Sequence, residues 1–189
     1  MPLNVPNLLT WARIVLVPLF LGVFFWPGLP PTTQNLLATA IFGLAALTDW
    51  FDGYLARRLG QTSAFGAFLD PVADKLMVAA ALILLVDLER VGAVPAFIIV
   101  GREIAISALR EWMAGLGASK SVAVSFIGKL KTTAQMIAIL LLLYHMPVLG
   151  MDVQPLGQVL IWIAALLTLW SMGYYLRRAW PEIRARVLP

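Results

Sequence analysis

Long apolar stretches constrain the fold of this chain more than any other feature. A helix needs roughly 20 apolar residues to cross the hydrocarbon core of a bilayer, and stretches of that length recur about six times in the 189 residues. Hydrophobic residues make up 61% of the chain and charged residues only 13%, which excludes an ordinary soluble domain. We therefore predict an all-α, polytopic integral membrane protein. The expected spans are roughly 8–26, 34–57, 67–87, 92–114, 122–145 and 155–177.

Glycine, proline and short polar residues separate these stretches, as at ordinary helix ends. No linker, repeat or change of composition divides the chain, so residues 1–189 are expected to form one transmembrane domain. The first stretch is interpreted as a membrane span, not a cleaved signal peptide, because Arg13 is its only early positive charge. The absence of cysteine excludes disulfides and cysteine-based zinc sites. The single His145 is interpreted as an interfacial residue.

The distribution of lysine and arginine predicts the orientation. These residues gather at the second and fourth breaks and after the last span. The first and fifth breaks have none, and the third has only Arg90. Since positive residues accumulate on the cytoplasmic side, both termini are expected in the cytoplasm.

Four aspartates lie in one short part of this apolar chain, in two pairs whose members are three and four residues apart. They are Asp49 and Asp52, then Asp70 and Asp74. Both spacings place two side chains on one helix face. Acids at membrane depth are costly unless they are paired, hydrated or bound to metal. Four carboxylates would balance two Mg²⁺ or Mn²⁺ ions, which prefer oxygen ligands.

Two metal ions in one site indicate phosphoryl chemistry, because they clamp the attacking and leaving oxygens on phosphorus. Arg57, close to the same face, is placed to hold a diphosphate. In the alternative interpretation the acids cap helix ends or pair with Arg57, Arg58 and Lys75. That alternative explains one or two carboxylates, but not four at regular spacing.

Pro71 follows Asp70 directly, and a proline fits a helix best in its first turn. We therefore expect the third helix either to start near Asp70 or to be kinked there.

The aspartates belong to a longer pattern, D-x2-D-G-x2-A-R-x8-G-x3-D-x3-D, and on this signature the chain resembles the CDP-alcohol phosphatidyltransferase family. Its fixed positions are Asp49, Asp52, Gly53, Ala56, Arg57, Gly66, Asp70 and Asp74. The resemblance extends from about Asn7 to Tyr175. The residues around the signature are most similar to a bacterial branch whose acceptor is sn-glycerol 3-phosphate.

The resemblance implies an enzyme of phospholipid biosynthesis in the bacterial inner membrane, with its active site on the cytoplasmic side. It would transfer the phosphatidyl group of CDP-diacylglycerol to sn-glycerol 3-phosphate, giving phosphatidylglycerol phosphate and CMP. The first three aspartates would bind metal and the CDP diphosphate, while Asp74 would be both a metal ligand and the general base. Spacing alone does not distinguish Asp74 from Asp70. A homodimer is expected, and no nucleic-acid partner.

The expected CDP-diacylglycerol site combines small and polar residues, which would let phosphates approach the backbone. They are Asp49, Gly53, Ala56, Arg57, Gly66, Asn7 and Thr10. The last two, with Arg13, resemble a polar N-terminal element that borders the nucleotide in this family. The alternative is that they cap a helix at the membrane interface.

A dianionic acceptor needs a basic pocket near the metal ions. The candidates are Arg102, Arg110, Lys129 and Lys131, and the alternative for each is anchoring at the cytoplasmic interface. Arg102 and Arg110 lie on one helix face, about 12 Å apart along the axis. The two side chains therefore cannot both bind one phosphate unless other residues take part. Glu103 and Glu111 are placed to neutralise some of these charges.

Two other functions stay open at this point. One is the same chemistry with another acceptor, namely serine, inositol phosphate or phosphatidylglycerol. The other is cation transport, for which ionisable residues should continue towards the far side of the membrane; here the acids cluster at one face.

Overall fold

A computed structural model describes residues 5–59, 64–115, 117 and 126–187. Within these ranges the side chains of 5–7, 50–59, 64–68, 70, 126–129 and 185–187 are outside the description. The described residues form six α-helices and no named strand, which confirms the all-α prediction for this part of the chain. The helices are α1 (Val5–Phe25), α2 (Pro31–Leu59), α3 (Ala64–Asp87), α4 (Ala93–Gly115), α5 (Phe126–Tyr144) and α6 (Gln154–Val187).

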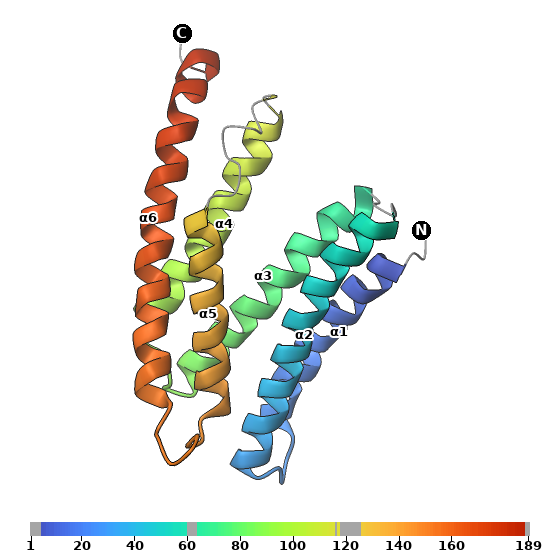
Figure 1. Cartoon of the computed structure of the whole chain (residues 1–189), viewed down its shortest axis with the longest axis vertical. Coiled ribbons are helices and arrows are strands. Elements are labelled where there is room, and N and C mark those ends of the chain that lie inside the picture. The colour runs from blue at the N-terminus through green and yellow to red at the C-terminus, as the bar shows by residue number, and fades with distance from the viewer. Residues whose placement is uncertain (1–4, 60–63, 116, 118–125, 188–189) are drawn as a thin grey trace.

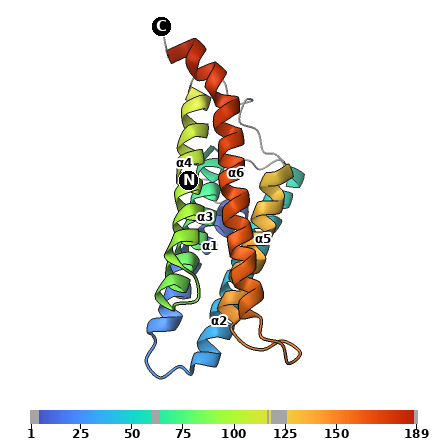
Figure 2. The same cartoon turned by 90° about the vertical axis from the view of Figure 1, so that its left-hand side faces the viewer.

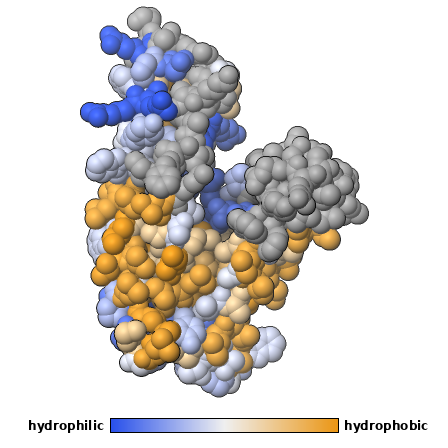
Figure 3. Space-filling view, viewed as in Figure 1, coloured by the Kyte–Doolittle hydropathy of each residue, from blue (hydrophilic) through white to orange (hydrophobic). Residues whose placement is uncertain are grey.

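The helices form two groups of three (Figure 1). In the first, α1 packs on α2 and α3; in the second, α6 packs on α4 and α5. Contacts of α2 with α5, and of α3 with α4 and α5, join the two groups. The groups diverge towards the end at which both termini lie (Figures 1 and 2). The space-filling view shows a hollow between the two groups at this end (Figure 3).

The main hydrophobic core joins the two groups. It includes residues from all six helices, among them Phe20, Phe42, Leu82, Leu85, Ile99, Leu142 and Ile161. The rings of Phe20 and Phe42 pack with their centroids 6.4 Å apart. A second, smaller cluster joins α4 to α6 nearer the termini, through Ile106, Met113, Tyr175 and Ala179. Packing of apolar faces, more than local helix propensity, holds such helices together.

Arg90, in the turn between α3 and α4, joins three elements at the end opposite the termini. Its Nη1 donates to the carbonyl oxygens of Leu142 and Leu143, each at 3.1 Å, and its Nη2 donates to Asn35 Oδ1 at 2.8 Å. The last carbonyls of a helix lack partners within the helix and carry partial negative charge. Arg90 therefore satisfies the end of α5 and ties it to α2.

The expected spans match the observed helices to within four residues at every end except one. The exception is the last span, expected to end at 177, because α6 continues to Val187 with Pro181 inside it. For the third helix, the alternative of a start near Asp70 is wrong, and the alternative of a kink there stays a prediction. The helix starts at Ala64 and runs through Pro71, because the loss of one backbone donor is offset by a buried face that includes Ala73, Met77 and Ala81.

The surface is apolar over much of the molecule. Figure 3 shows hydrophobic side chains over both groups, with hydrophilic ones in the hollow and near the C-terminal end. Leu19, Ile83 and Phe97 are each more than half exposed, and soluble monomers rarely expose large contiguous apolar patches. Two described segments, Leu8–Phe25 and Gln154–Arg184, are long and apolar enough to cross a bilayer. These features indicate a membrane protein.

Candidate active site

The four aspartate positions lie on two contacting helices. Asp49 and Asp52 belong to α2, Asp70 and Asp74 belong to α3, and the two helices pack on each other. This agrees with the predicted pair of helices. Several predicted site residues lie in described helices but have side chains outside the described set. They are Asn7, Asp52, Gly53, Ala56, Arg57, Gly66, Asp70 and Lys129.

Arg13 of α1 forms an ion pair with Asp49 of α2. The Arg13 side chain is only 2% exposed, whereas that of Asp49 is 47% exposed. The buried guanidinium of Arg13 therefore contacts one side of the Asp49 carboxylate, and the other side of this carboxylate is open to a ligand. Thr10, one turn before Arg13, is fully buried. Since α1 begins at Val5, the helix-cap interpretation is wrong for Thr10 and Arg13.

Asp74 lines two small cavities that lie next to each other. The first contains Arg13 and small residues of α2 and α3, such as Ala45 and Ala73. The second contains Glu103 of α4, with Lys131 and Gln135 of α5. Asp74 thus lies at the junction between the α1–α2–α3 group and the α4–α5 side of the hollow.

Glu103 neutralises two of the predicted basic residues. It forms ion pairs with Lys131 and with Arg102, the latter at 3.0 Å from Arg102 Nη1. Arg102 Nη2 also donates to Ser171 Oγ of α6 at 3.0 Å. Lys131 and Arg102 are buried, and a buried charge is tolerated only when it is paired and hydrogen-bonded. The neutralising role expected for Glu103 is confirmed.

Gln135 is a further polar residue that the sequence analysis missed. Its side chain is buried and lines the second cavity beside Asp74 and Lys131. Its Oε1 has no hydrogen-bond partner among the described residues. Buried polar atoms of this kind are normally satisfied by water or a ligand. The only sequence signal is its position four residues after Lys131, on the same face of α5.

Tyr175 of α6 lies between the two predicted arginines of α4 and was also missed. The guanidinium carbons of Arg102 and Arg110 lie 5.5 and 5.3 Å from the centroid of its ring. Both distances are within the range of a cation–π interaction. Arg110 is half-buried, and no ion pair joins it to another described residue.

Comparison with known families identifies the family to which the chain belongs. The family model described as CDP-alcohol phosphatidyltransferase matches residues 3–170, which include all the residues discussed above except Tyr175 and Ser171. The chain belongs to the CDP-alcohol phosphatidyltransferase family.

Two relatives from this family are similar to this chain over nearly its whole length. One is from Shigella flexneri serotype 5b (strain 8401) and one from Escherichia coli (strain K12). Each is 52% identical over 181 residues, covering 95% of this chain and 96% of the relative. Both are named CDP-diacylglycerol–glycerol-3-phosphate 3-phosphatidyltransferase.

The donor atoms of this phosphatidyltransferase fit a hard divalent cation. Asp49 and Asp74 supply carboxylate oxygens, and Asp52 and Asp70 stand on the same two helices. Oxygen ligands of this kind are those that Mg²⁺ and Mn²⁺ prefer. The described side chains alone contain no group of three acids or histidines around one point. Because two of the four carboxylates lie outside that set, the four-aspartate site stays a prediction.

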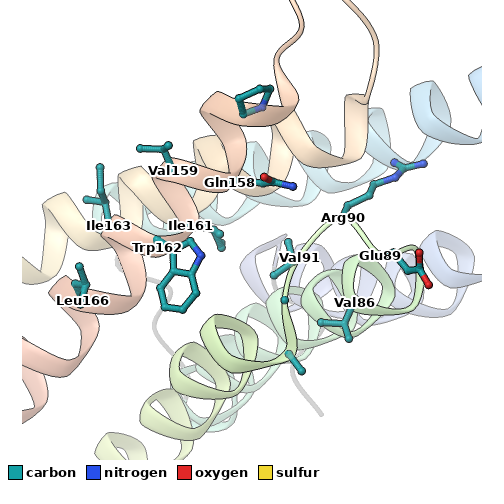
Figure 4. Close-up of a pocket in the computed structure, with 13 residues that line it drawn as sticks. Val86, Glu89, Arg90, Val91, Gln158, Val159, Ile161, Trp162, Ile163 and Leu166 are labelled. Carbon is teal, nitrogen blue, oxygen red and sulfur yellow. The ribbon is translucent and has the colours of Figure 1, made fainter.

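A large groove among the described residues of the phosphatidyltransferase is remote from these residues. It lies between α6 and the α3–α4 turn, and is lined by apolar residues such as Val159, Trp162 and Leu166 (Figure 4). Arg90 borders it but points away, towards its partners on α2 and α5 (Figure 4). The groove therefore offers no chemistry for a phosphate substrate.

Proposed function

We propose that this enzyme transfers the phosphatidyl group of CDP-diacylglycerol to sn-glycerol 3-phosphate, giving phosphatidylglycerol phosphate and CMP. Relatives that are 52% identical over 95% of the chain carry the name of this reaction. The structural observation that supports it best is the place of Asp74. This carboxylate faces one cavity beside Arg13 and a second beside Lys131, as a group between a nucleotide donor and an anionic acceptor must.

On the donor side, Asp49, Asp52 and Asp70, together with Asp74, would hold two Mg²⁺ or Mn²⁺ ions at the site of the CDP diphosphate. The ions, when bound, neutralise diphosphate charge and polarise the phosphorus that is attacked. Arg13 fixes the orientation of Asp49 through their ion pair. Arg57 binds the diphosphate directly. The residues that border the nucleotide are Gly53, Ala56, Gly66, Asn7 and Thr10.

On the acceptor side, Asp74 accepts the proton of the attacking glycerol hydroxyl. A bond forms between that oxygen and the phosphorus of the phosphatidyl group, while the bond from this phosphorus to the CMP oxygen breaks. CMP leaves with the electron pair, and Asp74 keeps the proton until it passes to solvent. Gln135 Oε1, buried and unpartnered beside Asp74, accepts a hydrogen bond from a second glycerol hydroxyl.

The acceptor phosphate is held by cations near Asp74. Lys131 lines the same cavity as Asp74, and Arg110 lies nearer the open end of the hollow, with Lys129 and Arg102 as further candidates. The two terminal nitrogens of Arg102 already bond to Glu103 and Ser171, so its contribution is indirect. Lys131 must exchange part of its pairing with Glu103 for the phosphate.

We further propose six membrane spans, with both termini and the active site on the cytoplasmic side of the bacterial inner membrane, and a homodimeric assembly. The described arginines support this orientation. Arg110, Arg177, Arg178 and Arg184 lie towards the helix ends that share a side with the termini. At the opposite end, Arg90 is engaged with helix carbonyls and Asn35, so it is a structural residue.

The test is product identification with purified protein. The protein is incubated with CDP-diacylglycerol, Mg²⁺ and one acceptor at a time: sn-glycerol 3-phosphate, serine, inositol phosphate or phosphatidylglycerol. Mass spectrometry should detect phosphatidylglycerol phosphate, with stoichiometric CMP, only for glycerol 3-phosphate. A lipid product formed faster with one of the other alcohols would contradict the proposed acceptor.

A further inference from the structure

The two predicted arginines on α4 are far apart along the helix, but both contact the same residue of α6. Arg102 and Arg110 are eight residues apart, so their backbones are separated by about 12 Å along the helix axis. One phosphate cannot bridge that distance. Yet both guanidinium groups reach the ring of Tyr175, at 5.5 and 5.3 Å. A single side chain from another helix therefore sets the position of both cations.

The two cations differ in what else they contact. Arg102 bonds through its two terminal nitrogens to Glu103 and to Ser171, and only its buried Nε has no partner among the described residues. Arg110 has the Tyr175 ring, and no hydrogen bond from it to another described residue is present. A guanidinium that lies over a ring uses its flat face for that contact, and the N–H donors around its edge stay available for a bidentate anion.

The burial of Tyr175 makes this arrangement rigid. The ring is 1% exposed and packs in the small cluster with Ile106, Met113 and Ala179. Those residues come from α4 and α6, the same two helices that carry the arginines and the tyrosine. The Arg110 side chain, which would otherwise sample many rotamers, is thus restricted by a fixed surface. Restriction before binding reduces the entropy lost when the ligand binds.

We propose that Tyr175 is a positioning residue for the acceptor: its ring holds the Arg110 guanidinium with its free donors directed to the phosphate of the incoming alcohol. Tyr175 itself touches no reacting atom. This inference rests on the proposed function, because it assigns Arg110 to the acceptor and not to the nucleotide. It goes beyond that function by placing a determinant of acceptor affinity on α6, beyond the residues that the family model matches.

The neighbouring residue supplies a matched control. Tyr174 makes the same type of interaction, with the Arg178 guanidinium carbon 5.5 Å from its ring centroid. That pair is on the exposed side of α6, where Tyr174 is 37% exposed. The Tyr174 ring also packs edge-on against the Tyr175 ring, with the centroids 5.8 Å apart. Replacing Arg178 therefore removes an equivalent cation–π contact from the same helix and leaves this ring contact in place.

The experiment measures KM for both substrates and kcat in three variants. Tyr175→Leu should raise KM for glycerol 3-phosphate about 3- to 30-fold, the range expected from loss of a partly desolvated cation–π contact. KM for CDP-diacylglycerol should change less than about twofold. Tyr175→Phe keeps the ring and should retain most acceptor affinity, and Arg178→Gln should match the unchanged enzyme. Equal increases in both KM values for Tyr175→Leu would overturn the proposal.

Two variants that keep an aromatic ring at position 175 test the proposal even if Tyr175→Leu misfolds. Pentafluorophenylalanine at position 175 keeps the ring but removes its negative face, so KM for glycerol 3-phosphate should rise relative to Tyr175→Phe. An identical KM in these two variants would overturn the proposal, whatever the leucine variant does. If the unchanged enzyme makes no phosphatidylglycerol phosphate, the proposed function fails. If it makes that product but the two KM values do not separate, only the role of Tyr175 fails.

Discussion

Ion pairs between helices determine where charged side chains can lie in this apolar molecule. Arg13 pairs with Asp49 across α1 and α2, and Lys131 pairs with Glu103 across α5 and α4. Each pair brings a buried cation to an acid that is itself partly exposed. Removing one member of a buried pair is costly because it leaves an uncompensated charge. Asp74 lies between the two pairs and lines cavities with members of both.

Replacing the aspartates one at a time should distinguish those needed for CDP binding from the one needed only for the chemical step. In the proposed site Asp49 and Asp70 are metal ligands, so Asp49→Asn and Asp70→Asn should nearly abolish both turnover and CDP binding. Asp74→Asn should keep CDP binding and lose turnover about 10²-fold or more, since general-base catalysis contributes 10²–10⁴. CDP binding by calorimetry and CMP release by each variant check this. Loss of CDP binding in Asp74→Asn equal to that in Asp70→Asn would remove the reason for naming Asp74 the base.

Lys131→Gln should weaken binding of the acceptor and leave binding of CDP-diacylglycerol nearly unchanged. The variant loses a cation beside Asp74, and Glu103 keeps Arg102 as its partner, so the fold should persist. KM for glycerol 3-phosphate should rise at least tenfold, because a charge-assisted contact to a dianion contributes about 1.5–3 kcal/mol, while KM for CDP-diacylglycerol should stay nearly constant. Arg184→Gln, at an exposed position on α6, is the control. If both KM values rise together, Lys131 is not part of an acceptor pocket.

At the scale of helices, α5 and α6 approach each other closely at Gly157. A Cβ atom added there would lie 2.7 Å from Leu142 Cγ and 2.9 Å from its Cδ2. Leu142 is fully buried in the main core and its carbonyl accepts from Arg90. It therefore has little freedom to move aside. The absence of a side chain at Gly157 is what lets the α5–α6 hairpin close.

Gly157→Val should destabilise the protein through this contact. Overpacking a core typically costs about 1–3 kcal/mol, so the thermal unfolding temperature in detergent should fall by several degrees. Gly173→Val is the matched control on the same helix, because nothing lies within 4 Å of the Cβ position there. Equal unfolding temperatures for the two variants would show that α5 and α6 are not packed this closely.

At the scale of the whole molecule, the two helix groups meet at one end and leave a hollow at the other (Figures 1 and 3). Asp74 lines cavities with residues of both groups, and both termini are at the end where the groups diverge (Figure 1). A soluble acceptor and a lipid-linked nucleotide can thus approach the same carboxylate from different sides. The orientation of the hollow in the membrane decides from which compartment the acceptor comes.

Cysteine labelling tests this orientation without background, because the chain has no cysteine. Leu149, 93% exposed in the α5–α6 turn, is at the end opposite the termini. In intact cells a membrane-impermeant maleimide should label Leu149→Cys, after the outer membrane is permeabilised where one is present. Arg184→Cys should be labelled only after the inner membrane is opened. The reverse pattern would place the active site outside the cytoplasm.

Metal removal should abolish activity of the whole enzyme. Exhaustive EDTA treatment should reduce CMP release to background, and Mg²⁺ or Mn²⁺ should restore it. Ca²⁺ should restore little, since its longer bonds and looser coordination place the diphosphate differently. CMP release is measured after dialysis against each ion. Full activity in the metal-free enzyme would contradict the role given to the aspartates.

The sequence alone determined the features that depend on local spacing and on apolar length. Long apolar stretches must form helices, because a backbone in lipid has to satisfy its hydrogen bonds internally, and the observed helices follow those stretches closely. Spacings of three and four residues placed the aspartates in pairs on α2 and α3. The proximity of Glu103 to Arg102 in sequence likewise indicated that it would neutralise positive charge, and it does.

Only the tertiary structure decided which helix faces meet. Helical periodicity shows that Arg102 and Arg110 share a face, but not that Tyr175, 65 residues beyond Arg110, lies against it. It likewise shows Arg13 within an apolar stretch without identifying Asp49 as its partner. The length of α6 and the passage of α3 through Pro71 also depend on contacts with other helices. The physical reason is that spacing determines the direction of a side chain relative to its own helix axis, whereas the packing of buried faces determines the neighbour that it contacts.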